Sequence, residues 1–157
     1  RKSKIMKILV ISDSHGRLER LISIYEKEQP DVVICAGDHS EDGENLSFIH
    51  PEAKYYIVKG NCDFYDIKSE DEMVIELGEH RVLLAHGHHY GEKQTYGIIE
   101  ARGRELGCDI VIFGHTHRQE LIEKDGITLF NPGAVLSNQY GILKMDKEKI
   151  DFLQKRS

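Results

Sequence analysis

Short apolar runs that each end in a polar segment are the feature that most constrains the fold of this chain. Lys7-Ile8-Leu9-Val10-Ile11 leads into Ser12-Asp13-Ser14-His15-Gly16, and residues 31–36 lead into Gly37-Asp38-His39. Apolar, β-branched runs of this kind are typical of strands that are buried on both faces. Because residues 18–25 carry apolar side chains at helical spacing, we predict a strand, a helix and a second strand that pairs in parallel with the first.

The rest of the chain continues this alternation and then becomes mostly strand. We predict helices over residues 40–48 and 96–106, the second capped by Gly107 in a left-handed conformation. Strands are expected over residues 54–58, 73–77, 81–85, 109–113, 120–124, 127–130, 141–145 and 150–153. The strands predicted over residues 73–77 and 81–85 are spaced as a hairpin. Asn131-Pro132-Gly133 is interpreted as a plain turn from its composition.

The composition is that of a globular protein with a single domain. The chain has 157 residues, of which 39% are hydrophobic and 31% are charged, and such a length holds one core rather than two enzyme domains. Met6 is a candidate natural start, so we expect residues 6–157 to form one domain and residues 1–5 to be an extension. No apolar run approaches the roughly 20 residues that a membrane-spanning helix needs, so no membrane association is expected.

Cysteine usage and charge limit the compartment and the partners. Cys35, Cys62 and Cys108 are an odd number at wide spacing, which neither builds a disulfide framework nor matches a Cys-x-x-Cys zinc site. We therefore expect a reducing, cytoplasmic location. The formal net charge of -6 repels a polyanion, so no extended nucleic-acid surface is expected. A homodimer stays open as an assembly state, because homodimers are the commonest soluble oligomers.

The polar segments share one location, at the carboxyl end of a predicted strand. In open α/β sheets these ends form the crevice in which ligands bind, so their side chains should converge. They supply carboxylate, amide and imidazole groups, which bind divalent metals at neutral pH. In Asp13-Ser14-His15 and His115-Thr116-His117, residues two apart on extended backbone point the same way, so each pair is expected to reach a shared site.

Five of these segments, in order along nearly the whole chain, resemble the signature motifs of the calcineurin-like metallophosphoesterases. The motifs are Asp13-Ser14-His15, Gly37-Asp38, Gly60-Asn61-Cys62-Asp63, His86-Gly87-His88 and Gly114-His115-Thr116-His117. The short length, the Gly-Asn-Cys-Asp form and Asn131-Pro132-Gly133-Ala134 are similar to the small archaeal and bacterial phosphodiesterase branch, which also includes the retromer scaffold subunit of eukaryotes. The resemblance implies an α/β fold, a four-layer αββα sandwich with two mixed β-sheets flanked by helices.

The resemblance also implies a site with two divalent metal ions. The ligands of the first ion would be Asp13, His15, Asp38 and His117. Those of the second would be Asp38, Asn61, His86 and His115, with Asp38 bridging both ions. A catalytic role is predicted for Asp38, Asn61 and His86. Manganese is the leading candidate, and nickel, iron, zinc and magnesium remain alternatives, because nitrogen and oxygen ligands do not select among these ions.

The physical properties of such a site favour hydrolysis of a phosphodiester. Two divalent ions carry more positive charge than the carboxylates of Asp13 and Asp38 cancel, so the surplus attracts a phosphate and a hydroxide. Ions about 3.5–4 Å apart hold a bridging water as hydroxide near neutral pH and stabilise both the attacking and the departing oxygen. We therefore predict a metal-dependent phosphoric diester hydrolase that acts on a small phosphodiester, with the metal-bridging hydroxide as the nucleophile.

Cys62 is the point at which the chain departs from the larger family. Many of those enzymes carry a histidine there that protonates the leaving group, and general acid catalysis is worth roughly 10²–10⁴-fold. We expect slow turnover of alkyl esters, unless His39, His88 or His89 replaces the missing acid. The alternative function is a non-catalytic metal-binding scaffold that resembles the retromer subunit. A scaffold is free to lose ligands, whereas this chain keeps every implied one.

Overall fold

The computed structural model describes residues 5–37, 40–58, 72–86, 97–114, 118–146 and 149–156. The strands in these residues are β1 (Met6–Ile11), β2 (Val32–Ala36), β3 (Lys54–Val58), β4 (Glu72–Leu77), β5 (His80–Ala85), β6 (Ile110–Ile112), β7 (Gln119–Lys124), β8 (Ile127–Pro132), β9 (Gln139–Asp146) and β10 (Lys149–Arg156). The helices are α1 (Leu18–Glu28), α2 (Ser40–Ile49), α3 (Gly97–Glu105) and the 3-10 helix η1 (Val135–Ser137). The predicted helices and strands are present, with small shifts at their ends.

Within the described residues the strands form two mixed sheets of five strands each. Their orders are β10-β9-β1-β2-β3 and β4-β5-β6-β8-β7. Neighbours in the series β1, β2, β3 pair in parallel, as do neighbours in the series β5, β6, β8. The other pairs are antiparallel, including the predicted hairpin of β4 and β5. The carboxyl ends of the parallel strands therefore lie at one edge of each sheet.

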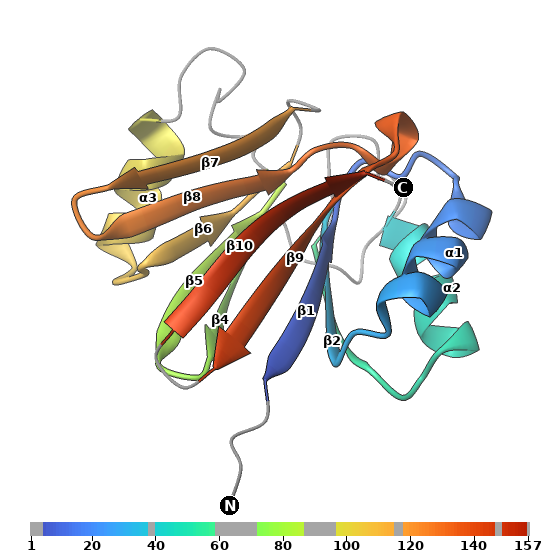
Figure 1. Cartoon of the computed structure of the whole chain (residues 1–157). Coiled ribbons are helices and arrows are strands. Elements are labelled where there is room, and N and C mark those ends of the chain that lie inside the picture. Colours follow the sequence, from blue (N-terminus) through green and yellow to red (C-terminus); the bar gives the residue numbers. More distant parts are fainter. Residues whose placement is uncertain are drawn as a thin grey trace, which may run out of the picture.

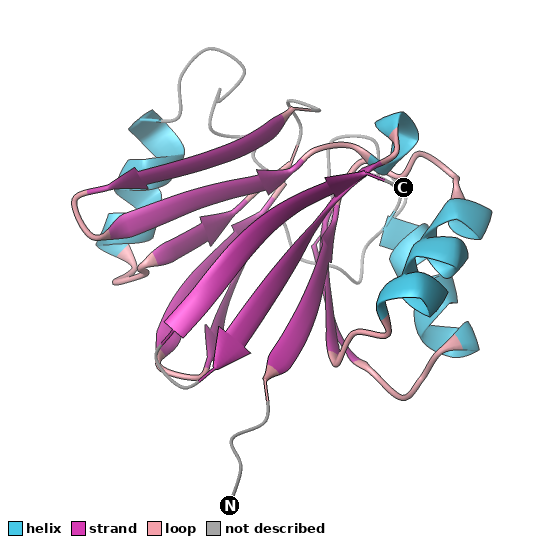
Figure 2. Cartoon of the chain, in the orientation of Figure 1, coloured by secondary structure: helices cyan, strands magenta, loops and turns pink. Residues whose placement is uncertain are grey.

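Apolar side chains hold the sheets and helices together in layers. Ile8 of the first sheet and Leu84 of the second belong to the core between the sheets. Leu21 of α1 packs with Leu9 against the outer face of the first sheet, and Ile99 of α3 belongs to the core on the outer face of the second. Figure 1 shows α1 and α2 on one side of the sheets and α3 on the other, and Figure 2 shows the strands between these helices. The four-layer αββα sandwich is confirmed.

The helices are short and end at residues that suit a helix end. α1 has 11 residues, α2 has 10 and α3 has 9. After α1, Gln29 has left-handed backbone and its N–H donates a 2.8 Å hydrogen bond to the Tyr25 carbonyl, and Pro30 follows. Gly107 after α3 has φ of 74°, as predicted. None of the helices in the described part of the chain is long and apolar enough to cross a membrane.

A buried carboxylate ties the end of α1 to the first sheet. Glu28 is 5% exposed. It accepts hydrogen bonds from the Tyr140 hydroxyl at 2.5 Å and from Nζ of Lys155 at 3.3 Å, and Nζ of Lys7 lies 2.8 Å from its other oxygen. Burial by itself raises the pKa of Glu28, but these partners outweigh burial and lower the pKa from 4.5 to about 2. One ionised side chain thus links α1 to β1, β9 and β10.

Glu28→Gln should destabilise the fold by about 1–3 kcal/mol at neutral pH, because Lys7 and Lys155 lose their buried counterion. The native pKa is depressed, so the ionised carboxylate stabilises the fold above about pH 4.5, and this contribution is lost as the pH falls from there to about 2. Urea unfolding near neutral pH and near pH 3 measures the difference in the free energy of unfolding between wild type and variant. This difference should be smaller at the lower pH.

Glu123→Gln is the control for this prediction, because Glu123 is an exposed carboxylate on β7. This variant should change the free energy of unfolding by less than about 0.5 kcal/mol at both pH values. An equal loss in the two variants, or a Glu28→Gln gap that does not depend on pH, would contradict the role of Glu28.

Candidate metal centre

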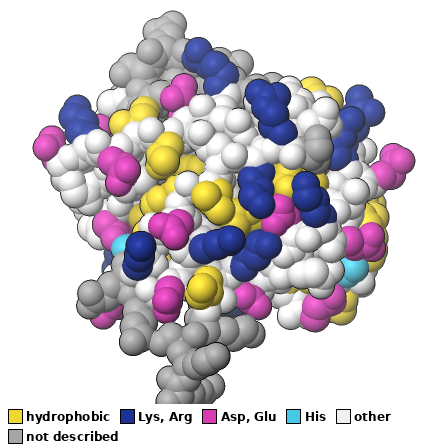
Figure 3. All heavy atoms as spheres, in the orientation of Figure 1, with side chains coloured by type: hydrophobic (Ala, Val, Ile, Leu, Met, Phe, Trp, Pro, Cys, Tyr) yellow, Lys and Arg dark blue, Asp and Glu magenta, His cyan; other side chains and the backbone are white. Residues whose placement is uncertain are grey.

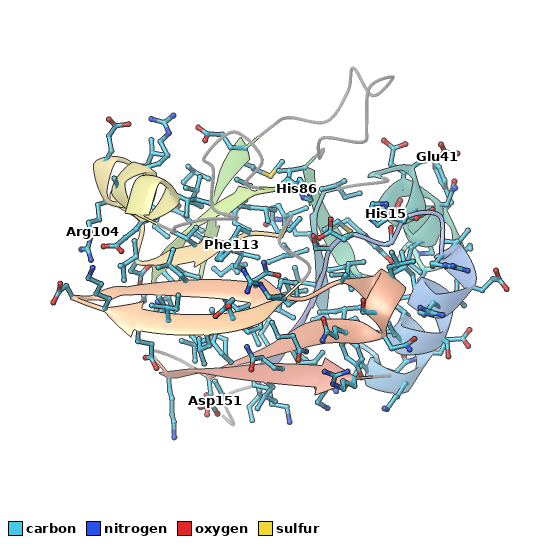
Figure 4. All side chains as sticks on the ribbon, turned by 90° about the horizontal axis from the view of Figure 1, so that it is seen from above. His15, Glu41, His86, Arg104, Phe113 and Asp151 are labelled. Atoms are coloured by element: carbon cyan, nitrogen blue, oxygen red, sulfur yellow. The ribbon has the colours of Figure 1, made fainter. Side chains whose placement is uncertain are left out.

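The ends of strands from both sheets meet on one side of the molecule. Asp13 follows β1 in the first sheet, and His86 follows β5 in the second. Both residues are fully buried, with 0% exposure. Figure 4 shows His15, which lies two residues after Asp13, on the same side as His86. The structure therefore brings together the three predicted ligands that it describes.

The two oxygens of the Asp13 carboxylate face different neighbours. Oδ2 accepts a 2.7 Å hydrogen bond from the Ser12 hydroxyl. Oδ1 lies 3.8 Å from Nε2 of His15 and 3.6 Å from Nε2 of His86, which is beyond the usual hydrogen-bond range of about 2.7–3.2 Å. An anionic oxygen and two imidazole nitrogens thus approach one another, and this donor set suits divalent metal ions.

A backbone carbonyl orients the ring of His86. Nδ1 of His86 lies 2.7 Å from the carbonyl oxygen of Ala36. Because a carbonyl oxygen only accepts, Nδ1 carries the proton of this bond, which leaves Nε2 on the side of Asp13 as the nitrogen that can bind a metal ion. Histidine ligands are commonly oriented in this way, by donating the other ring N–H to a carbonyl or carboxylate. The geometry therefore fits His86 as a ligand through Nε2.

Gly37 lets the two sheets approach each other at this point. A Cβ atom on Gly37 would lie 2.7 Å from the ring of His86, and its φ of +95° is a conformation that side chains rarely adopt. The Gly37 carbonyl also accepts a 3.0 Å hydrogen bond from the N–H of Asp13. A residue without a side chain is therefore required where the ends of β1, β2 and β5 meet.

The segment that carries Asp13 and His15 has left-handed backbone. φ is 54° at Asp13, 47° at His15 and 81° at Gly16, a region in which Asp and His are enriched among non-glycine residues. The prediction that Asp13 and His15 lie on extended backbone is therefore wrong. The two side chains approach each other because the chain turns at both residues. A local bond from the Arg17 N–H to the Ser14 carbonyl closes this turn, and bonds to Gly37 and Asp42, which are distant in the sequence, hold it in place.

Asn131 is a candidate positioning residue that the sequence prediction missed. It is fully buried. Its Nδ2 donates a 3.1 Å hydrogen bond to the Gly114 carbonyl, and its Oδ1 accepts a 2.8 Å bond from the N–H of Gly133. The N–H of Gly114 in turn donates to the His86 carbonyl at 3.0 Å. Asn131 therefore holds the backbone that immediately precedes the predicted ligand His115.

The interpretation of Asn131-Pro132-Gly133 as a plain turn is wrong for its first two residues. Asn131 and Pro132 belong to β8 and pair with Glu120 and Gln119 of β7. Asn and Pro are common in turns, so composition favours a turn even where a strand continues. The resemblance of Asn131-Pro132-Gly133-Ala134 to the small phosphodiesterase branch was the one sequence signal that set this segment apart from an ordinary turn.

Four of the predicted ligands lie outside the described residues: Asp38, Asn61, His115 and His117. The same holds for His39, Cys62, Asp63, His88 and His89. Within residues 5–37, 40–58, 72–86, 97–114, 118–146 and 149–156, no group of three or more His, Cys, Asp or Glu side chains is arranged to hold a metal ion by itself. The complete cage therefore stays a prediction, of which Asp13, His15 and His86 supply the described part.

The two cysteines that the structure describes, Cys35 and Cys108, are buried and form no disulfide. Burial, together with the charge of Asp42, raises the pKa of Cys35 to about 12. Burial also raises the pKa of Cys108. Both side chains are therefore protonated thiols at neutral pH, which are poor nucleophiles and poor metal ligands.

Comparison with known proteins identifies the family. The model of the calcineurin-like phosphoesterase superfamily domain matches residues 6–147. The chain belongs to this superfamily. It is 36% identical over 151 residues to the probable metallophosphoesterase YsnB of Bacillus subtilis, and the match covers 91% of this chain and 86% of the relative. The chain is thus a phosphoesterase of a family that uses divalent metal ions, for which the donor set at Asp13 is suitable.

Two further similarities extend across the chain. Phosphodiesterase MJ0936 of Methanocaldococcus jannaschii is 28% identical over 166 residues, which cover 94% of this chain and 96% of the relative. The structure of vacuolar protein sorting 29 from Cryptosporidium parvum superposes with a TM-score of 0.78 at 20% identity, covering 98% of this chain and 99% of that chain. The second similarity concerns the fold alone.

Gly114→Ala should weaken divalent-metal binding by about tenfold or more. A Cβ atom on Gly114 would lie 1.9 Å from Oγ of Ser12 and 3.0 Å from Oδ2 of Asp13, so the alanine must displace the hydroxyl that orients the carboxylate. Titration calorimetry of the metal-free protein with Mn²⁺ measures the change. Gly126→Asn is the control, because nothing lies within 4 Å of its Cβ position and Asn tolerates left-handed backbone. Wild-type affinity in Gly114→Ala would contradict the prediction.

Proposed function

We propose that the chain hydrolyses small phosphodiesters with two divalent metal ions. The proposed ligands are Asp13, His15, Asp38, Asn61, His86, His115 and His117. The observation that carries the proposal is the approach of two histidine Nε2 atoms, one from each sheet, to the buried Oδ1 of Asp13. A buried carboxylate, a neighbouring imidazole that is partly exposed and a buried imidazole from a distant segment have no structural need to converge, whereas a metal site requires such a group.

Hydrogen bonds within the chain hold two of the proposed ligands in place without a metal ion. Ser12 orients the carboxylate of Asp13, and the Ala36 carbonyl orients the ring of His86. Donors that are already held in place need little reorganisation, either when they bind an ion or when the reaction proceeds. The proposed ligands would hold two ions, and such ions would supply positive charge for the phosphoryl oxygens and would lower the pKa of a water, the chemistry that hydrolysis of a phosphodiester needs.

The preference for diesters rests on relatives and on Cys62. The similarity to phosphodiesterase MJ0936 supports a diester substrate. Cys62 supports a substrate with a good leaving group, because a thiol does not replace the histidine acid of the larger family. Manganese is the proposed ion, with nickel, iron, zinc and magnesium as alternatives.

The remaining proposals concern partners. On the face shown in Figure 3, Lys and Arg side chains are interspersed with Asp and Glu. This mixture supports a small phosphodiester, rather than an extended nucleic acid, as the substrate. A homodimer remains the proposed assembly if the chain associates.

A non-catalytic metal-binding scaffold is the second candidate function. Its support is the fold shared with vacuolar protein sorting 29 and an exposed apolar pair at the end of α2, where Phe48 is 79% and Ile49 48% exposed. Apolar side chains of this size are found at contacts with other proteins. Metal-dependent turnover distinguishes the two functions, because a scaffold needs none.

His86→Ala should lower Mn²⁺-dependent hydrolysis of bis(p-nitrophenyl) phosphate by about 10²-fold or more, because it removes a proposed ligand and leaves the Ala36 carbonyl without its ring donor. His80→Ala is the matched control. His80 lies at the opposite end of β5, where its Nδ1 is 2.6 Å from a carboxylate oxygen of Asp109.

The rates are measured on metal-free protein reloaded with each candidate ion, and circular dichroism checks that both variants are folded. Turnover that is absent in wild type with every ion would favour the scaffold. Equal rates in His86→Ala and wild type would contradict a role for His86.

Aryl phosphodiesters should be hydrolysed faster than alkyl phosphodiesters by roughly 10²-fold or more, because general acid catalysis matters most for poor leaving groups. Cys62→His should raise the rate on the alkyl substrate more than the rate on the aryl substrate. Initial rates on bis(p-nitrophenyl) phosphate and a dialkyl phosphate, at equal Mn²⁺, measure both ratios. Equal rates on the two substrates in wild type would show that another residue supplies the acid.

A further inference from the structure

One carboxylate oxygen bonds to the residues on both sides of His15. Oδ2 of Asp42 accepts a 2.6 Å hydrogen bond from the Ser14 hydroxyl and a 2.8 Å bond from the N–H of Gly16. Ser14 and Gly16 are the immediate neighbours of His15 in the chain. Asp42 is 7% exposed and its bond to Ser14 is buried, so this bond is shielded from water and costly to lose, whereas the bond to Gly16 is partly buried.

The conformation between these two bonds is one that histidine rarely adopts. Left-handed backbone costs about 1–2 kcal/mol for a non-glycine residue, and φ is positive at both Asp13 and His15. Such conformations persist where the surroundings impose them, and they cluster at functional sites. At Asp13 the bond to the Gly37 carbonyl and a 3.3 Å bond from the Leu136 N–H do this. At His15 a local 3.1 Å bond from the Arg17 N–H to the Ser14 carbonyl closes the turn, and Asp42 adds the bonds to Ser14 and Gly16.

Asp42 also joins this loop to the helix that follows the second predicted ligand loop. It lies in the first turn of α2, four residues after Asp38 in the sequence. A negative charge in the first turn of a helix is favourable with or without a further partner. The helix therefore explains why an acid is tolerated there but does not explain why its side chain reaches back to Ser14 and Gly16.

We propose that Asp42 is a positioning residue for metal binding. It holds the Ser14–Gly16 turn so that Nε2 of His15 faces Oδ1 of Asp13, and it keeps this loop in register with α2. The proposal rests on the proposed function in one respect, that His15 is a ligand. The position of His15 itself does not depend on any metal, so it can be measured separately.

Four variants distinguish the hydrogen bonds that Asp42 accepts from the negative charge that it carries. Asp42→Ala removes both acceptor bonds, whereas Asp42→Asn keeps a carbonyl oxygen that can accept them. Ser14→Ala removes one bond and leaves the carboxylate in place. Glu41→Ala is the matched control: it removes a carboxylate from the same first turn of α2, and Glu41 is exposed and lies at the outer side of the molecule (Figure 4).

Two measurements test the proposal. Titration calorimetry with Mn²⁺ on metal-free protein should show an affinity loss of about 10–100-fold in Asp42→Ala, a smaller loss in Ser14→Ala, and near wild-type affinity in Asp42→Asn and Glu41→Ala. Histidine ring NMR of the metal-free proteins should show the His15 signals moving toward those of a solvent-exposed histidine in Asp42→Ala while the His86 signals stay in place. Asp42→Asn should keep both sets of signals.

The outcomes separate the two proposals. Unchanged His15 signals and Mn²⁺ affinity in folded Asp42→Ala would overturn the role of Asp42, and so would an equal loss in Glu41→Ala. If Asp42→Ala does not fold, Ser14→Ala decides by the same two readouts. Wild-type protein that binds Mn²⁺ but hydrolyses no diester would overturn the proposed function and leave the Asp42 comparison intact. Wild-type protein that binds none of the candidate ions would overturn both the proposed function and the role of Asp42 in metal binding.

Discussion

A circuit of hydrogen bonds joins the strand ends of the two sheets, and the candidate site depends on it. The N–H of Asp13 bonds to Gly37, His86 bonds to Ala36, Gly114 bonds to His86, and Asn131 bonds to Gly114 and Gly133. The N–H of Val135 then returns to the Ser12 carbonyl at 3.0 Å. Two sheets that pack only through apolar side chains could slide past each other, but these directional bonds set one relative placement of β1, β2, β5, β6 and β8.

Close approach of backbone is the condition for this circuit. Gly37 and Gly114 lie where a Cβ atom would overlap the ring of His86 or the hydroxyl of Ser12. Core packing elsewhere in the protein tolerates exchange of one apolar side chain for another of similar volume. At the strand ends the neighbours are polar atoms in fixed bonds, so even one added methyl group must break a bond. This contrast explains why the site should be far more sensitive to small substitutions than the cores beneath it.

Burying polar groups at the candidate site costs free energy, and the fold does not require these groups to be buried. Asp13 and His86 are fully buried, and left-handed backbone at Asp13 and His15 adds local strain. Glu28 shows the other use of a buried carboxylate: it is matched by two lysines and a tyrosine and links helix to sheet. The carboxylate of Asp13 instead faces imidazole nitrogens at 3.6 and 3.8 Å, an arrangement suited to binding a cation.

Apolar periodicity and short motifs are local properties, so the sequence alone was enough to predict the secondary structure and to indicate the family. It identified strand β1, helix α1 and the chemical character of Asp13, His15 and His86. Three features became visible in the tertiary structure alone. They are the left-handed turn at His15, the strand conformation of Asn131 and the hydrogen bonds of Asp42 to Ser14 and Gly16. The partners in these cases are 17 residues apart for Asn131 with Gly114 and 28 for Asp42 with Ser14. Such pairings depend on how the two sheets and α2 pack, and no pattern of neighbouring residues encodes that packing.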